Sequence, residues 1–165
     1  MKKIVVIGPE STGKSTLTKA LAEHFNCPYV KEYAREYLEK RDGQYQQNDI
    51  LYIAKKQVEL EDSIDPKSPL LFLDTDLIVC KVWSEFKYGH CDPWILEQIE
   101  KRQYDHYLLC ASDIPWVEDK LREHPNHRQE LFDIYVRELE HYKKPYSVVS
   151  GENRLQSALD YLQSF

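Results

Sequence analysis

The octapeptide at residues 8–15 constrains this chain more than any other feature. Its sequence, Gly8-Pro9-Glu10-Ser11-Thr12-Gly13-Lys14-Ser15, fits the phosphate-loop pattern G-x-x-x-x-G-K-[ST] without a mismatch. A β-branched run precedes it and an amphipathic helical pattern follows it, which is the context that the motif needs. In such loops backbone N–H groups cradle phosphate oxygens, the lysine reaches the β- and γ-phosphates, and the hydroxyl after it is suited to Mg²⁺. We therefore predict ATP and Mg²⁺ as cofactors, with these binding residues: Gly8, Glu10, Ser11, Thr12, Gly13, Lys14, Ser15 and Thr16.

Length and composition indicate a single globular domain over residues 1–165. The net charge of −6 disfavours a nucleic-acid partner, because the phosphates of that partner would be repelled. No apolar run is long enough to span a membrane, and the four cysteines show neither a C-x-x-C pair nor zinc-type spacing. The first strand pattern begins at residue 3, which leaves no room for a targeting segment. We therefore expect a cytoplasmic protein without a membrane partner.

Strand-like and helical runs alternate along the chain. The strand-like runs are residues 3–8, 28–31, 70–74, 107–110 and 146–149. The helical patterns are residues 14–25, 33–40, 48–62, 77–86, 93–101, 127–142 and 152–162. This alternation predicts an α/β P-loop NTPase, a five-stranded parallel sheet with helices on both faces. Ligands of such sheets bind beyond the carboxyl ends of the strands, so the residues at those ends are the candidates for function.

Acidic side chains follow the second and third strand-like runs. Glu32 ends the second run, where its carboxylate can accept the proton of an acceptor hydroxyl or orient that hydroxyl for attack on the γ-phosphate. The alternative is an acidic residue that only begins a helix. Arg35 lies one helical turn further on and can pair with Glu32 or with a phosphate. After the third run we assign Asp74 to Mg²⁺, Asp76 to the acceptor and Thr75 to the helix cap, and the converse assignment of the two aspartates stays open.

A polar segment interrupted by proline, at about residues 112–128, follows the fourth strand-like run and carries Arg122 and Arg128. Phosphoryl transfer needs cationic donors over the transferred group, and a mobile lid can bring them in while it excludes water. We predict such a lid here, with both arginines as catalytic residues. Solvated surface charge is the alternative for each of them.

An aromatic cluster lies between the third and fourth strand-like runs and comprises Trp83, Tyr88, His90 and Trp94. Aromatic walls suit a flat ring, and above all a cationic one. We predict that Tyr88 and Trp94 bind the acceptor. Trp83 is assigned to the core, and His90 is explained equally well as a loop residue without a role.

Four motifs, met in chain order, resemble the ribosylnicotinamide kinase domain of the bacterial NadR-type NAD-biosynthesis proteins. They are the phosphate loop, then Glu32-Tyr33-Ala34-Arg35-Glu36, then Phe72-Leu73-Asp74-Thr75-Asp76, then Trp116-Val117-Glu118-Asp119 with Arg122. The resemblance spans nearly the whole chain. It implies ATP-dependent phosphorylation of the 5′-hydroxyl of nicotinamide riboside to nicotinamide mononucleotide, on a nucleoside-kinase-like sheet with strand order 2-3-1-4-5.

The same resemblance extends the set of expected site residues. Tyr33 and Arg35, within the second motif, join the predicted substrate-binding residues. In kinases of this build the turn before the last helix lies beside the adenine, so Arg154 is predicted to contact it, with surface charge as the alternative. Family members often carry further domains ahead of the kinase. Because this chain starts at the first strand-like run, we expect a stand-alone kinase that stops at the mononucleotide.

Two other functions remain open at this stage. One keeps the enzyme class and changes the acceptor to another nucleoside or to a cationic vitamin such as thiamine. The other is a P-loop regulatory ATPase or switch, in which hydrolysis drives a conformational change. Carboxylates at two further strand ends favour a kinase, because a switch needs a positioned water and no acceptor pocket.

Overall fold

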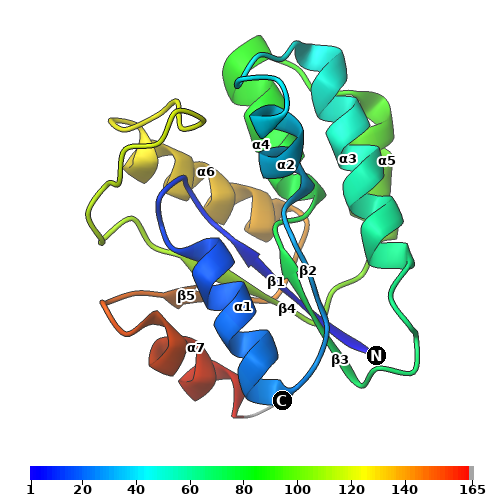
Figure 1. The fold of residues 1–165 in the computed structure, drawn as a ribbon, viewed down its shortest axis with the longest axis vertical. Coiled ribbons are helices and arrows are strands. Elements are labelled where there is room, and N and C mark those ends of the chain that lie inside the picture. The colour runs from blue at the N-terminus through cyan, green and yellow to red at the C-terminus, as the bar shows by residue number, and fades with distance from the viewer. Residues whose placement is uncertain (164–165) are drawn as a thin grey trace.

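The computed structural model describes residues 1–163, in which five parallel strands form one sheet (Figure 1). The strands are β1 (Lys2–Ile7), β2 (Tyr29–Val30), β3 (Leu70–Asp74), β4 (His106–Cys110) and β5 (Tyr146–Val149). The helices are α1 (Lys14–Phe25), α2 (Tyr33–Glu39), α3 (Gln47–Asp62), α4 (Leu77–Tyr88), α5 (Pro93–Lys101), α6 (Arg128–His141) and α7 (Arg154–Leu162). Within residues 1–163, none of them combines the length and the apolar character needed to cross a bilayer.

The order of the strands in the sheet is β2-β3-β1-β4-β5. This order and the parallel pairing of all neighbouring strands confirm the predicted fold. The predicted bounds of the elements lie within two residues of the observed ones. Such differences are expected at element ends, where the last hydrogen bonds fray.

Helices cover both faces of the sheet. Val5, Leu71 and Tyr107 face one apolar cluster, which they share with α3, α4, α5 and α6. Their chain neighbours Ile4 and Phe72 face a second cluster, which they share with α1 and α7. Figure 1 shows these two helical layers on opposite sides of the strands. A parallel sheet that is buried on both faces needs continuous apolar strands, which explains the unbroken apolar run at residues 70–73.

The register of the central strands brings the candidate functional residues to one edge. Val6 of β1 lies opposite Asp74 of β3, and Ile7 lies opposite Leu109 of β4. The phosphate loop leaves β1 at this edge and ends at Gly13, which begins α1 with a left-handed φ of 80°. Residues 111–127, between β4 and α6, form neither helix nor strand and contain most of the predicted lid.

Gly8→Ala is expected to destabilise the protein more than Gly89→Ala does. Gly8 has a φ of +147°, and a Cβ there would lie 2.7 Å from the backbone oxygen of Cys110, so the β1–β4 pairing would have to distort. At Gly89, with a φ of +80°, a Cβ would meet no atom within 4 Å, so only backbone strain of about 1–2 kcal/mol is expected. At Gly8 overpacking should add about 1–3 kcal/mol to the loss of unfolding free energy. Urea unfolding of both variants measures this difference. Equal losses would contradict the close approach of β4.

Candidate active site

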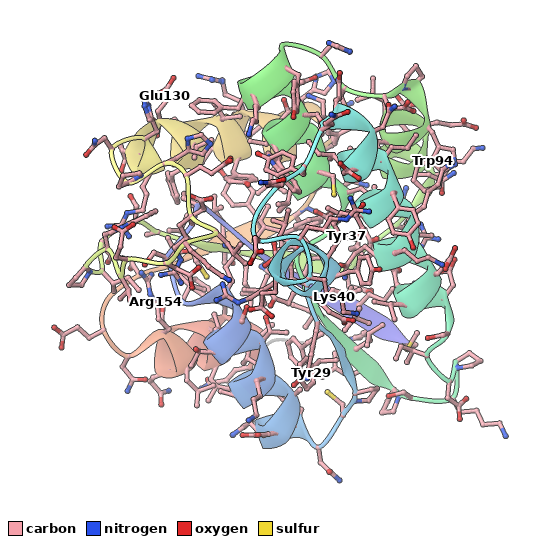
Figure 2. The ribbon with its side chains drawn as sticks, turned by 45° about the horizontal axis from the view of Figure 1, so that its top comes forward. Tyr29, Tyr37, Lys40, Trp94, Glu130 and Arg154 are labelled. Atoms are coloured by element: carbon pink, nitrogen blue, oxygen red, sulfur yellow. The ribbon has the colours of Figure 1, made fainter. Side chains whose placement is uncertain are left out.

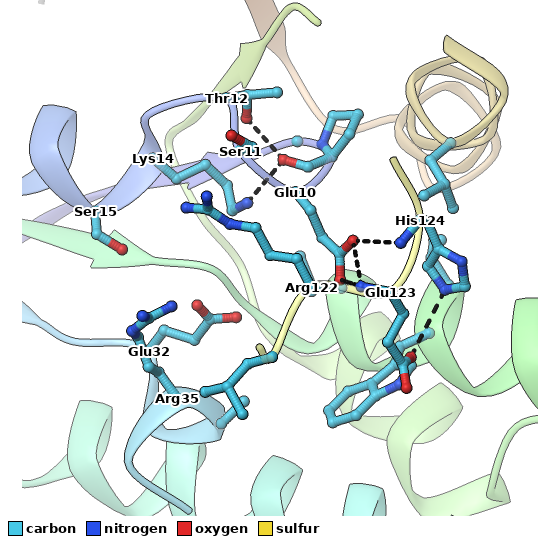
Figure 3. Close-up of a pocket in the computed structure, with 18 of the residues that line it drawn as sticks. Glu10, Ser11, Thr12, Lys14, Ser15, Glu32, Arg35, Arg122, Glu123 and His124 are labelled. Carbon is cyan, nitrogen blue, oxygen red and sulfur yellow. Dashed lines mark hydrogen bonds and ion pairs between the residues drawn. The ribbon is translucent and has the colours of Figure 1, made fainter. Parts of the chain in front are cut away.

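A cavity of about 240 Å³ opens at the carboxyl edge of the sheet. Figure 3 shows its polar side, formed by the phosphate loop, the start of α2 and the predicted lid. Side chains from α2, α4, α6 and the connecting segments form an apolar wall opposite the loop. The residues of this wall are Ala34, Leu38, Tyr45, Val79, Val82, Trp83, Phe86, Leu121, Leu131 and Tyr135. The cavity therefore joins a phosphate-binding surface to an apolar compartment.

The side chain of Lys14 folds back over the phosphate loop to which it belongs. Its Nζ donates to the backbone oxygen of Pro9 over 2.9 Å, and the Thr12 hydroxyl donates to the same oxygen over 2.7 Å. Ser11 has a left-handed φ of 55°, which helps the loop to curl around the ammonium group. An ammonium group has three donors, so Lys14 keeps capacity for phosphate oxygens.

Ser15 and Asp74 form a contact that is suited to a divalent cation. The Ser15 hydroxyl donates to Asp74 Oδ2 over 2.5 Å, whereas the buried Asp74 Oδ1 has no hydrogen-bond partner. Burial raises the pKa of the Asp74 carboxyl, and the Ser15 hydrogen bond and the Lys14 charge act in the opposite direction. Among the described residues no group of three acidic, histidine or cysteine side chains could hold a metal. One hydroxyl and one carboxylate nevertheless fit Mg²⁺, which takes its remaining ligands from water and substrate phosphates.

Glu32 lies at the carboxyl end of β2, immediately before α2, and faces the cavity (Figure 3). It occupies the N-cap position of α2, yet its side chain makes no capping hydrogen bond. Burial and then the negative charge of Asp74 raise the pKa of this carboxyl to about 7, although Lys14 and Arg35 oppose the shift. A carboxyl group with a pKa near neutrality can exchange a proton with a substrate hydroxyl.

Of the two predicted catalytic arginines, Arg122 lines the cavity, and Arg128 is not among its lining residues. Arg122 extends toward Lys14 in Figure 3, with one guanidinium N–H donating to the Val117 carbonyl. Arg128 donates to the carbonyl oxygens of Ser11 over 3.0 Å and Ile114 over 2.8 Å. Both arginines therefore contact the lid or loop backbone, in contrast to freely solvated surface charges.

Arg35 connects α2 to the predicted lid. Its guanidinium pairs with Asp119 over 2.6 Å and with Glu39 over 3.3 Å. The pairing partner proposed from the sequence, Glu32, contributes only a weaker charge interaction that raises the Arg35 pKa. In this structure Arg35 therefore joins the acceptor side of the cavity to the lid.

The aromatic residues at the cavity differ from those predicted. Trp83 packs against the hydrophobic core, as predicted, and it also lines the cavity. Its Nε1 donates to the Tyr45 hydroxyl over 2.8 Å. The two rings meet edge to face with centroids 4.8 Å apart. Burial raises the Tyr45 pKa to about 12, so the phenol stays neutral and donates to Glu123 over 2.7 Å.

Tyr88, Trp94 and Tyr33 are absent from the cavity lining, so the structure does not support their predicted contacts with the acceptor. Figure 2 places Trp94 at the outer edge of the helical layer, where the Lys55 ammonium lies 5.4 Å from its ring. Tyr33 packs against the rings of Tyr37 and Tyr52. Tyr88 lies off the face of α4 that lines the cavity, whereas Trp94 and Tyr33 belong to α5 and α2.

Asp76 has a structural role here, which corrects its assignment to the acceptor. It is buried and caps α4 by accepting from the Ile78 N–H over 3.0 Å, and it also accepts from the Tyr107 hydroxyl over 2.6 Å. The prediction that Thr75 is the cap was therefore wrong. In a regular strand the two aspartates, at i and i+2, would point to the same face, but Thr75 between them has a left-handed φ of 70° that breaks the extended geometry. Asp74 therefore contacts Ser15, whereas Asp76 contacts Tyr107.

Arg154 is buried where β4 and β5 end, at the beginning of α7 (Figure 2). Its guanidinium donates to the carbonyl oxygens of Val149 over 2.5 Å and Ala111 over 2.8 Å, and it pairs with Asp113 over 2.7 Å. These contacts exclude the surface-charge alternative. The contact with adenine stays a prediction.

Several cavity residues were not predicted from the sequence. Val79, Val82 and Phe86 follow the helical period of α4, a pattern that reads equally as ordinary core packing. Tyr45 lies in the connection between α2 and α3 and carries no recognisable motif. The helical spacing after the third strand was the only signal that could have indicated this wall.

Comparisons with known proteins now assign the family. Residues 3–154 match the family model described as an AAA domain. The chain belongs to this AAA domain family. The AAA domain match covers every element from β1 to the first residue of α7, and therefore the whole cavity.

The sequence of this AAA domain is also similar to a characterised relative. It is 28% identical over 128 residues to the trifunctional NAD biosynthesis/regulator protein NadR of Salmonella typhimurium, covering 74% of this chain. The chain spans only 31% of the length of that relative.

Solved structures of NadR share the fold. A NadR protein in complex with NR superimposes with a TM-score of 0.79 at 26% identity, covering 99% of this chain and 50% of the other. A NadR protein with NAD and AMP-PNP gives a TM-score of 0.76 at 26% identity, covering 99% and 49%. These similarities confirm the resemblance to NadR-type proteins predicted from the sequence.

The raised Glu32 pKa predicts a specific pH dependence of stability. A carboxyl with a folded-state pKa of about 7 and an unfolded value of 4.5 binds its proton more tightly in the folded protein, so its contribution to stability is lost as the pH rises from 4.5 through 7. Glu32→Gln should therefore stabilise the protein relative to wild type by about 1–3 kcal/mol more at pH 8 than at pH 4.5. Urea unfolding at both pH values measures this difference.

Glu36→Gln is the matched control on the same helix. Its hydrogen bond to Lys40 lowers the Glu36 pKa, so the control should show the opposite and smaller pH trend. If both variants behaved alike, the carboxyl of Glu32 would have an ordinary pKa.

Proposed function

We propose that this chain is an ATP-dependent kinase that phosphorylates nicotinamide riboside to nicotinamide mononucleotide. We further propose that residues 1–165 form a single kinase domain with a lid at about residues 112–128, acting in the cytoplasm. Its four cysteines are free thiols, as is usual in that reducing compartment. NadR structures with NR and with AMP-PNP support both the acceptor and the phosphoryl donor.

One observation carries the proposal: Glu32 lines the same cavity as the phosphate loop and the apolar wall. A switch ATPase needs only a positioned water, whereas this arrangement adds a compartment for an organic acceptor beside a carboxyl group of suitable pKa. The wall contains Trp83 and Tyr45, whose rings can pack against a flat cationic ring.

The residues around the phosphate loop divide the task of charge stabilisation. Lys14 and Arg122 supply positive charge to the transferred phosphoryl group, and Arg128 holds the loop to the lid. Ser15 and Asp74 would hold Mg²⁺, which when bound neutralises charge on the phosphate oxygens. Because the donors are fixed before reaction, little reorganisation is needed during transfer.

Glu32 accepts the proton of the acceptor hydroxyl as that oxygen attacks the γ-phosphate. The new P–O bond forms as the bond between the γ-phosphorus and the leaving ADP breaks, and the proton stays on the Glu32 carboxyl until it is released to solvent. Its pKa of about 7 suits this transfer, because the carboxylate is present near neutrality and is still basic.

An acceptor screen with γ-labelled ATP tests the proposed function. Nicotinamide riboside, common nucleosides and thiamine are compared under identical conditions, and we expect nicotinamide riboside to give the highest kcat/KM. Preference for a nucleoside or for thiamine would replace the acceptor while keeping the enzyme class. ATP turnover that no acceptor stimulates would overturn the kinase and support a switch.

Glu32→Gln is expected to lower kcat by about 10²–10⁴-fold and to change the Kd for ATP little, since the variant removes a general base. Single-turnover kinetics and equilibrium binding of an ATP analogue separate the two effects. Glu36→Gln serves as the control, because Glu36 is exposed and pairs with Lys40 over 2.6 Å. A loss of ATP affinity with normal transfer from the bound nucleotide would make Glu32 a structural residue.

A further inference from the structure

Glu10 places a negative charge inside a loop that is built to bind phosphate. It lines the cavity beside Lys14, so it repels the same phosphate oxygens that the loop attracts. The loop pattern accepts any residue at this position. The charge of Glu10 opposes phosphate binding, and the loop motif does not require an acidic residue there. Its presence therefore indicates a further role for the Glu10 carboxylate.

The carboxylate of Glu10 holds two consecutive backbone N–H groups of the lid. The Glu123 N–H lies 3.2 and 3.1 Å from the two carboxylate oxygens, and the His124 N–H donates over 2.9 Å. Figure 3 shows these bonds crossing from the loop to the lid. Hydrogen bonds from neutral N–H groups to a carboxylate are stronger than those to an uncharged oxygen.

These hydrogen bonds lie next to Arg122 in the chain, so they can fix the position of that arginine. Arg122 immediately precedes the two N–H groups, and its guanidinium reaches toward Lys14 (Figure 3). At the other end of the same lid segment, the Val117 N–H donates to the Ser11 hydroxyl over 2.9 Å. Two adjacent residues of the phosphate loop, Glu10 and Ser11, thus hold the backbone on both sides of Arg122.

We infer that Glu10 is a positioning residue, which fixes the lid to the phosphate loop and thereby sets Arg122 over the transferred phosphoryl group. This inference rests on the proposed kinase function for its catalytic consequence. The contact itself is a property of the free protein and can be tested without any substrate.

Amide hydrogen exchange of the free protein tests the contact. Glu10→Ala should speed exchange at the Glu123 and His124 amides by about tenfold or more, because both lose their acceptor. Glu10→Gln keeps one carbonyl oxygen and should restore part of the protection. Glu152→Ala, which removes an exposed carboxylate near the end of β5, should leave these amides unchanged. Unchanged exchange in Glu10→Ala would overturn the inference whatever the substrate of the enzyme is.

A double-mutant cycle with Arg122→Ala tests the catalytic consequence. Glu10→Ala should lower kcat by about 10–100-fold with an unchanged or lower KM for ATP, since the variant also removes a repulsive charge. In the Arg122→Ala background the same change should cost less than about threefold, because Glu10 acts through Arg122. Equal losses in both backgrounds would overturn the positioning role. Failure of wild type to phosphorylate any acceptor would refute the kinase instead, with the exchange result intact.

Discussion

The pairing of β1 with β3 is the constraint on which the rest of the structure depends. Its register sets Val6 opposite Asp74, so the strand that leads into the phosphate loop ends beside the strand that supplies the carboxylate. The loop then returns into α1, which brings the Ser15 hydroxyl to within 2.5 Å of Asp74. A shift of one residue would turn Asp74 to the other face of the sheet and separate the two groups. The pairing is secured by apolar strands that are buried on both faces, so the free energy of core formation also fixes the geometry of the Ser15–Asp74 pair.

Charges at this edge of the sheet are balanced by neighbours of opposite sign. Glu32 and Asp74 are close enough to raise the pKa of Glu32, while Lys14 and Arg35 limit that shift. Burial is the larger cause of the raised pKa, because it withdraws the carboxyl from water. The side chain makes no capping hydrogen bond to α2 that would replace the lost hydration. Such an arrangement is unfavourable for stability at neutral pH and favourable for proton transfer. This balance is the one expected of the proton acceptor proposed above.

The segment proposed as a lid is attached mainly by polar contacts, with Leu121 packed against the cluster of Tyr37, Leu38 and Ile53. Residues 111–127 have no helix or strand of their own. Their polar contacts include those to Glu10 and Ser11 of the phosphate loop and to Arg35 of α2. Glu123 also contacts Tyr45 and Lys87. Hydrogen bonds and ion pairs at a surface contribute little net free energy each, so the segment can be released without unfolding the sheet. Those contacts still define one position, in which Arg122 faces the cavity. A directional but weak attachment of this kind is suited to a segment that must admit a substrate and then exclude water.

The sequence by itself determined the parallel sheet, its strand order through the family resemblance, and the phosphate loop, because these follow from local pattern and motif. It also indicated Glu32 and Asp74, since strand ends of a parallel sheet meet at one edge. Only the tertiary structure decided which side chains face the cavity. Asp76 turns inward as a helix cap, and Trp83 packs against the core while it also lines the cavity. Both outcomes depend on how α4 is rotated against its neighbours. Helix rotation is set by packing among residues distant in the chain, such as Tyr107 against Asp76, and no local pattern encodes it.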